Sequence, residues 1–326
     1  METKTLSAAK TLLAATALAA SSMAMAKPYP THAISIITPF PPGGAADVVL
    51  RLIAERLTES LNSPVVVENK GGAGGAIGTS FVARAAPDGY TLLLTSSSTM
   101  SINPQLRAKP PYDPFKDFTP IVMVGTSPNV LVVNSSLPIK TVSDLIDAAK
   151  KQPGALNFAS NGVGTLSHLT GELFKQMADI EMLHVPYKGA AQAAADTAGG
   201  QVAALFAAYA SVAPMVESQK LRALGVTSPN RISVAPEIPT IAESGLPEFE
   251  SNQWWGIWGP AGLPESVVST INTEVNKVLH DPQVKKRFAT ESVELTGGTP
   301  QELTDYLRTD YDKWTNVIKA AGIKAE

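Results

Sequence analysis

The chain has 326 residues, a formal net charge of −3 and no cysteine. The absence of cysteine excludes disulfides, thiolate metal sites and cysteine nucleophiles. Charges of both signs are interspersed, and no clustered basic face indicates a nucleic-acid partner. Beyond an N-terminal targeting segment, about 300 residues remain, enough for a sizeable core and, by the usual domain size, roughly two domains.

The first residues have the pattern of a secretory signal peptide. Lys4 and Lys10 form a positive region, residues 12–20 are mostly apolar, and Ala-Met-Ala at 24–26 is a small-x-small cleavage site. The apolar run is far shorter than the roughly 20 residues that a bilayer requires. We expect cleavage near Ala26, export, and no insertion of the mature chain into a membrane. A chain of this size without disulfides suits a bacterial periplasm.

The first predicted element is a strand over 32–38, and it leads into a loop that contains two glycines. The loop reads Pro-Phe-Pro-Pro-Gly-Gly-Ala-Ala-Asp at 39–47, and apolar residues then recur every four positions from Val49 to Leu61, which predicts a helix. Such a loop leaves backbone N–H groups unpaired, and the helix dipole adds positive potential. It is a candidate anion site. The alternative is an ordinary turn, in which Gly and Pro supply only backbone geometry.

Strand-like and helical patterns alternate along the rest of the chain, which predicts α/β units with largely parallel sheets. A glycine-rich turn at 71–78 fails the dinucleotide-binding fingerprint, because Ile77 stands where the third glycine is required. Residues 104–120 are predicted to form a surface connection. The predicted strands are 65–67, 91–95, 122–133, 157–159, 182–185, 202–206, 221–226 and 254–258, and helices are predicted after the glycine-rich turn, at 141–150, from Leu166, and in the C-terminal part after Pro264 and Pro300.

The pattern of strand, glycine loop and helix occurs twice, at 39–47 and at 160–168, in what we predict to be different domains. Two helix N-termini that face each other across a cleft would hold a carboxylate from both sides. Four charge-assisted N–H bonds would supply roughly 6–12 kcal/mol before the cost of association, against about 8 kcal/mol for micromolar binding. The pattern therefore favours a carboxylate site that needs no arginine.

Four segments together resemble the Bug receptors, the extracytoplasmic solute-binding proteins of tripartite tricarboxylate transporters. Each segment alone is weak, but their order and spacing over most of the mature chain are highly specific. The segments are Pro-Phe-Pro-Pro-Gly-Gly-Ala-Ala-Asp at 39–47; Glu-Asn-Lys-Gly-Gly-Ala-Gly-Gly-Ala-Ile-Gly at 68–78 with Ala-Pro-Asp-Gly-Tyr-Thr-Leu at 86–92; Gly-Thr-Leu-Ser-His-Leu at 164–169 with Val-Pro-Tyr-Lys-Gly at 185–189; and Leu-Arg-Ala-Leu-Gly-Val-Thr at 221–227 with Trp-Gly at 255–256 and Pro-Ala-Gly-Leu-Pro at 260–264.

The resemblance implies an α/β, two-lobed periplasmic binding protein of the Venus-flytrap type, each lobe a mixed sheet flanked by helices. We predict that lobe 1 comprises 27–124 and 228–326 and that lobe 2 comprises 125–227. The implied function is capture of a small carboxylate, a dicarboxylate or an aromatic carboxylate, and delivery to the membrane permease subunits of the transporter. The alternative is a ligand sensor that presents to a histidine kinase ectodomain. We expect a monomer without cofactor or metal.

The resemblance also indicates the ligand-binding residues. Family members hold a carboxylate between the loops matching 40–45 and 160–165, largely through backbone amides and ordered water. Hydroxyls that follow the strand at 91–95 lie where α/β sheets place binding loops. Asp47 is either a helix cap or a ligand-side residue, and His168 is either structural or near the ligand. The predicted set is Phe40, Pro42, Gly43, Gly44, Ala45, Asp47, Ser97, Ser98, Ser160, Asn161, Gly162, Gly164, Thr165, His168 and Ala207.

One departure from the family pattern bears on the ligand. Many members carry Asp directly after the Phe that matches Phe206, whereas this chain has Ala207. If that position lines the cleft, a ligand ammonium loses a counter-ion, so we expect a preference for carboxylates without an amino group.

An enzyme is the main competing class. The chain has no Gly-x-Ser-x-Gly nucleophile elbow, and His32, His184 and His280 do not have the spacing of metal ligands. No pair of carboxylates stands out for acid–base chemistry. We therefore predict no catalytic residues.

Overall fold

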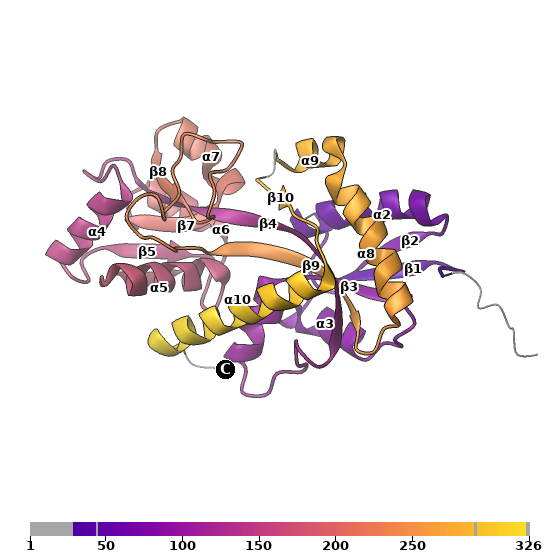
Figure 1. Cartoon of the computed structure of the whole chain (residues 1–326). Helices are drawn as coiled ribbons and strands as arrows, with labels where there is room; N and C mark the ends of the chain where they lie inside the picture. Colours follow the sequence, from indigo (N-terminus) through magenta and orange to yellow (C-terminus); the bar gives the residue numbers. More distant parts are fainter. Residues whose placement is uncertain (1–28, 44, 290–291, 324–326) are drawn as a thin grey trace, which may run out of the picture. The chain divides into compact units, whose positions relative to one another are not determined.

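The structure is a computed structural model that describes residues 29–43, 45–289 and 292–323. The predicted signal peptide and Gly44 lie outside the described residues. All helices and strands that the structure describes belong to one compact unit, His32–Glu326 (Figure 1). Among the described residues, no helix combines the length and the apolar character that crossing a bilayer requires.

Strands and helices alternate in the first part of the chain, as predicted. The predicted helical stripe of Val49, Ile53 and Leu57 is fully buried. The elements are β1 (Ile34–Thr38), α2 (Ala45–Leu61), β2 (Val65–Asn69), η1 (Ala73–Gly75), α3 (Ala76–Ala83), β3 (Thr91–Ser96), η2 (Ser98–Ile102), η3 (Asn103–Leu106) and β4 (Phe118–Asn134).

The second part continues the alternation and ends in helices. Pro300 is the first residue of the last helix, whose capping box is formed by Thr299 and Glu302, and Pro264 directly precedes the helix α8. The elements are α4 (Val142–Lys151), β5 (Asn157–Ser160), α5 (Leu166–Ala178), β6 (Leu183–Pro186), α6 (Ala190–Ala198), β7 (Ala204–Ala208), α7 (Tyr209–Glu217), β8 (Leu221–Val226), β9 (Asn252–Pro260), α8 (Glu265–His280), α9 (Pro282–Ala289), β10 (Glu294–Leu295) and α10 (Pro300–Ala320).

The strands join in the order β2-β1-β3-β9-β4-β7-β5-β6, with β8 and β10 also paired to β4. The pairs β1–β2, β1–β3, β5–β6 and β5–β7 are parallel, whereas β4 and β9 are antiparallel to their neighbours. The prediction of largely parallel sheets was therefore too simple, because the chain crosses between the two halves on strands of opposite direction. The predicted fold class, α/β with mixed sheets flanked by helices, is confirmed.

The long strand β4 belongs to both halves of the sheet. Its first part, Phe118–Pro128, pairs with β9, and its second part, Asn129–Asn134, pairs with β7 and β8. We call the strands on the β9 side the lobe 1 sheet and those on the β7 side the lobe 2 sheet. Figure 1 shows β4 and β9 running from one half to the other. The lobe boundaries at 124/125 and 227/228 remain a proposal; the first falls inside β4 and the second just after β8.

The last helix, α10, packs on both halves. Leu303 and Leu307 near its start join the buried cluster that contains Trp258 of β9, while Trp314 and Ile318 near its end join the buried cluster of lobe 2. Near the middle of α10, buried Asp310 accepts a hydrogen bond of 2.8 Å from the indole N–H of Trp254 on β9. This helix therefore links the two halves by burial, and the hydrogen bond holds its middle against β9.

Several elements differ from the sequence predictions, among them three helices, the short strand β10 and the start of β4. The helices α6, α7 and α9 were not predicted: α6 is rich in alanine, α7 contains Pro214, and α9 spans only 8 residues, too few to establish an apolar stripe from the sequence. The predicted surface connection over 104–120 ends early, because β4 begins at buried Phe118.

Gly171 tests how α5 is held against β5. A Cβ at Gly171 would lie 2.1 Å from Cε2 of Phe158, whose ring is fully buried and packed against Phe206. We expect Gly171→Ala to destabilise the fold by about 1–3 kcal/mol through overpacking, although alanine is the better helix former by about 1 kcal/mol. Urea unfolding measures the difference. The control is Gly189→Ala, since Gly189 is extended and its Cβ would meet nothing within 4 Å; equal stability of the two variants would contradict this packing.

Candidate functional site

A pocket of about 290 Å³, the cleft pocket, opens where residues of both half-sheets meet. It lies at the carboxyl ends of β3, β5 and β7, the position at which α/β sheets bind ligands. No charged side chain is among its lining residues, which are Ser98, Ser127, Asn129, Asn161, Thr165, Leu166, Ser167, Ala190, Ala208, Ser211, Gln253 and Trp255. The pocket is therefore uncharged, and hydroxyl and amide groups line it together with apolar surface.

Three helix N-termini reach the cleft pocket. Leu166 and Ala190, the first residues of α5 and α6, line it, as do Ala208, which directly precedes α7, and Ser211 in the first turn of α7. Thr165 caps α5 with its hydroxyl, which accepts from the N–H of His168 at 3.4 Å. By contrast, the N-cap residues of α6 and α7 are Gly189 and Ala208, and neither makes a side-chain cap. The first N–H groups of these helices have no intrahelical acceptor. Together with the helix dipoles they make the pocket attractive to an anion.

The second predicted binding loop, 160–165, is bonded largely to itself. Four of its backbone N–H groups already have acceptors: Asn161 donates to Ser167 Oγ (3.0 Å), Gly162 to Ser160 Oγ (3.1 Å), Gly164 to His168 Nδ1 (3.1 Å) and Thr165 to the Gly162 carbonyl (3.3 Å). Of the predicted loop residues, Asn161 and Thr165 line the cleft pocket. The N–H groups of Leu166 and Ser167, in the first turn of α5, lie at the pocket and have no intrahelical acceptor.

Ser160 and His168 were predicted as ligand contacts, and the structure places both behind the loop. Each is buried, and neither is among the lining residues of the cleft pocket. The hydroxyl of Ser160 bonds Gly162 and lies 2.6 Å from Nε2 of His184. Ser160 and His168 therefore bond the backbone of the loop. They share one neighbour, His184, which lies at hydrogen-bond distance from Ser160 and stacks on His168.

In the first predicted loop, Asp47 binds the loop that precedes it. Its carboxylate accepts from the Gly43 N–H (3.0 Å), Arg51 Nε (2.9 Å) and Asn69 Nδ2 (2.8 Å). The side chain of Asn69 also donates to the carbonyl of Phe40. Burial raises the pKa of Asp47, but the bonds from Arg51, Gly43 and Asn69 and the charge of Arg51 outweigh it and lower the pKa to about 2. Of the two roles considered for Asp47, these bonds are those of a cap on the loop before α2, and the ligand-side role stays a prediction.

The other residues of the first loop are not among the lining residues of the cleft pocket. Phe40 is half-buried, Pro42 and Gly43 are exposed, Ala45 is the first residue of α2, and Gly44 is outside the described residues. The glycine-rich segment packs beneath this loop: a Cβ at Gly78 would lie 3.1 Å from the Cα of Pro39. The absence of a side chain at Gly78 allows the two backbones to approach closely, so the glycine-rich segment has a structural role here.

The serines after β3 and the alanines after β7 differ in their relation to the pocket. Ser98 lines it, whereas Ser97 is fully buried, and its hydroxyl has no hydrogen-bond partner among the described residues. Buried hydroxyls are nearly always bonded, so this one is available to a ligand or water. Ala207 pairs with Val130 and is buried in the lobe 2 core, and Ala208, one residue on, lines the pocket.

Several lining residues escaped the sequence analysis. Ser127 and Asn129 lie on β4, and Gln253 and Trp255 lie on β9, the two strands that cross between the halves. A strand residue is brought to a cleft only by the path of its strand, and nothing local to it signals that. The Trp-Gly pair at 255–256 belongs to the segments that resemble the family, and this motif is the sequence feature that could have indicated Trp255.

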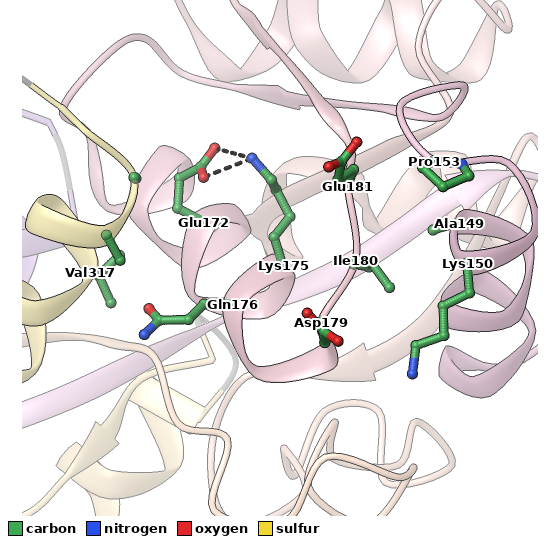
Figure 2. A pocket seen from close by; sticks show the side chains of 12 residues that line it. Ala149, Lys150, Pro153, Glu172, Lys175, Gln176, Asp179, Ile180, Glu181 and Val317 are labelled. Carbon is green, nitrogen blue, oxygen red and sulfur yellow. Dashed lines mark hydrogen bonds and ion pairs between the residues drawn. The ribbon is translucent and has the colours of Figure 1, made fainter.

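A larger pocket of about 640 Å³ lies elsewhere, between α4, α5 and the end of α10. Figure 2 shows Glu172 and Lys175 of α5 bonded to each other at its wall, at 2.8 and 3.0 Å. Lys150, Asp179 and Glu181 also line it, so its charges are of both signs. No helix N-terminus converges on this pocket among the described elements, and we favour the cleft pocket as the site despite its smaller volume. Within the described residues, no cluster of His, Asp and Glu is arranged to hold a metal ion.

Comparison with known proteins gives a consistent result. A family model described as "Tripartite tricarboxylate transporter family receptor" matches residues 49–323. The protein BugT of Bordetella pertussis (strain Tohama I) is 38% identical over 297 residues, which cover 91% of each chain.

Solved structures show the same fold. The periplasmic binding protein BugD is 34% identical with a TM-score of 0.73, covering 91% of this chain and 100% of that one. An R. palustris protein with adipate is 34% identical (TM-score 0.76, 91% and 99% covered), and MatC of Rhodopseudomonas palustris with bound malate is 29% identical (TM-score 0.72, 89% and 100% covered). The fold is thus the predicted two-lobed periplasmic binding protein.

The cap made by Asp47 predicts a pH-dependent contribution to stability. Its folded pKa of about 2 lies below the ordinary value of 3.8, so its contribution is present above about pH 4 and is lost as the pH falls toward 2. We expect Asp47→Asn to lower stability at pH 7 and to approach wild-type stability as the pH falls from 4 to 3. Urea unfolding at these pH values measures the difference, with exposed Asp147→Asn on α4 as the control. A deficit that does not change with pH would contradict the cap.

Proposed function

Because the chain belongs to the tripartite tricarboxylate transporter receptor family, we propose that it captures a small dicarboxylate or aromatic carboxylate in the periplasm and delivers it to the membrane subunits of a transporter. The family consists of substrate-binding receptors, so the chain is a receptor and not an enzyme. The signal-like pattern of residues 1–26 supports export. The ligand, the site and the partner are parts of the proposal.

The observation that carries the proposal is an uncharged pocket at which three helices begin. Each partly buried helix N-terminus contributes up to about 2 kcal/mol toward an anion, and each N–H bond to a carboxylate roughly 1.5–3 kcal/mol. A micromolar Kd corresponds to about 8 kcal/mol. The summed free energy of three helix ends and three or four such bonds, less the entropic cost of association, is of the size that micromolar binding requires. A carboxylate can therefore bind here without an arginine.

Donors line the pocket from several elements, and their number supports a ligand with two carboxylates. One set consists of the first turn of α5 and the hydroxyls after β3, and the other consists of the uncapped N-termini of α6 and α7. Apolar atoms of Leu166, Ala190 and Trp255 also line the pocket and suit a short hydrocarbon segment. Adipate and malate, bound by two proteins of similar structure, have this character.

The same lining disfavours an amino group on the ligand. No aspartate or glutamate is among the lining residues, and alanine occupies both 207 and 208. An ammonium would approach the positive ends of three helices without a counter-ion. The proposed class is therefore carboxylates that lack an amino group.

A thermal-shift screen followed by titration calorimetry tests the ligand class, since a ligand that binds only the folded state raises its stability by mass action. We expect adipate, malate and related dicarboxylates to raise the melting temperature and to bind more tightly than aspartate and glutamate. The reverse order would exclude the preference for ligands without an amino group. If no mono-, di- or tricarboxylate bound, the proposed function would be wrong.

Blocking the pocket tests its location. Ala208 is exposed and precedes α7, so Ala208→Phe fills the pocket without disturbing the core. We expect the carboxylate found in the screen to bind roughly tenfold more weakly or worse, with an unchanged melting temperature of the free protein. Ala195→Phe, at an exposed position of α6 that does not line the pocket, is the control. Equal affinity of the two variants would move the site elsewhere.

A further inference from the structure

Two histidines form a stacked pair behind the loop 160–165. The ring centroids of His168 and His184 are 3.8 Å apart, and the ring planes are inclined by 14°. On its other side, His184 stacks on Phe158 at 5.1 Å. His168 comes from α5 and His184 from β6, so the pair joins the helix that follows the loop to a strand beside it.

Each ring bonds one end of the loop. Nδ1 of His168 accepts from the N–H of Gly164 at 3.1 Å, and Nε2 of His184 lies 2.6 Å from the hydroxyl of Ser160. That hydroxyl in turn bonds both the N–H and the carbonyl of Gly162 at 3.1 Å. The two imidazoles therefore hold the loop at its start and near its end, on the side away from the cleft pocket.

The geometry requires a neutral His168. Its Nδ1 accepts a hydrogen bond, so this nitrogen carries no proton and Nε2 carries the only one. A further proton would go to Nδ1, where it would oppose the Gly164 N–H and break the bond. Two positive rings at 3.8 Å would also repel each other.

The charged groups that face the pair come from α5. Glu172 places a carboxylate oxygen 3.9 Å from Nε2 of His168, and Lys175 is bonded to that carboxylate. From β5, the neighbours are the uncharged ring of Phe158 and the hydroxyl of Ser160. Burial, together with the charge of Lys175, lowers the pKa of His168 to about 4. Burial also lowers the pKa of His184 to about 4. Charges on His168 and Lys175 act in the same direction as burial, and the charge of Glu172 opposes them.

We propose that His168 and His184 are positioning residues, whose stacked rings fix the shape of the loop 160–165 through Gly164 and Ser160, and that a proton on Nδ1 of His168 releases the loop. The consequence for carboxylate affinity rests on the proposed function. The positioning of the loop 160–165 by the two histidines does not depend on the proposed function, because it is a property of the protein without ligand.

Two substitutions of His168 separate hydrogen bonding from packing. His168→Asn keeps an acceptor close to the position of Nδ1 but removes the ring, whereas His168→Phe keeps a ring for stacking but removes the acceptor. Amide hydrogen exchange is measured on the free full-length mature protein. In His168→Phe we expect the amide of Gly164 to exchange roughly tenfold faster, the factor that loss of one hydrogen bond predicts. In His168→Asn it should stay within about threefold of wild type.

The same logic applies to the second ring. His184→Gln retains a polar group within reach of Ser160, and His184→Phe retains only the stack. We expect faster exchange at Gly162 in His184→Phe than in His184→Gln. Unchanged exchange in both phenylalanine variants would overturn the proposal. So would equal acceleration in all four variants in proportion to their loss of melting temperature, since that is the result expected for packing alone.

A pH titration gives a readout that packing does not move. In ¹H–¹⁵N spectra, we expect the Gly164 amide of wild type to shift with a midpoint near pH 4, and the amide of His168→Asn not to shift there. A titration of equal size in His168→Asn would contradict the role of Nδ1. Where the screen has found a carboxylate ligand, its affinity should fall in His168→Phe and be retained in His168→Asn. If wild type binds no carboxylate, the proposed function fails, and hydrogen exchange still decides the role of the histidines.

Discussion

The pairing of β4 with β9 is the constraint on which the rest of the structure depends. β4 continues from the lobe 1 sheet into the lobe 2 sheet, β9 pairs with β4 up to the point where the two sheets join, and α10 packs on both halves. The crossing brings the carboxyl ends of β3, β5 and β7 to one pocket, and β4 and β9 themselves supply part of its lining. Without this crossing, the helix N-termini of one half would face solvent and not a cleft.

The cleft pocket attracts an anion through backbone and not through side-chain charge. Three helices begin at it, two of them without a side-chain cap, and no charged residue is among its lining. Desolvating an arginine is costly, whereas a helix end is fixed in place by its own hydrogen bonds before the ligand arrives. In the function we propose, such a site recognises a carboxylate in general and leaves the identity of the ligand to apolar and amide side chains such as Trp255 and Gln253.

The sequence predicted the repeated elements and the two loops, because apolar periodicity and glycines are local signals. It did not predict how the loops use their amides. Both loops were expected to present unpaired N–H groups, yet Gly43 donates to Asp47 and Gly164 donates to His168. These partners are close in sequence, but a side chain four residues away can equally point to solvent. Only the packed neighbours Arg51, Asn69 and His184 fix Asp47 and His168 where they accept those bonds.

By itself, the sequence determined the α/β class and the family, because these follow from periodicity and from motifs in a fixed order. The tertiary structure decided which residues line the pocket. Ser127 and Gln253 reach it only through the path of two long strands, and Ala208 replaces its neighbour Ala207 because successive residues of a strand point to opposite faces. Which face meets a cleft is set by pairing between distant segments, and no local pattern contains that information.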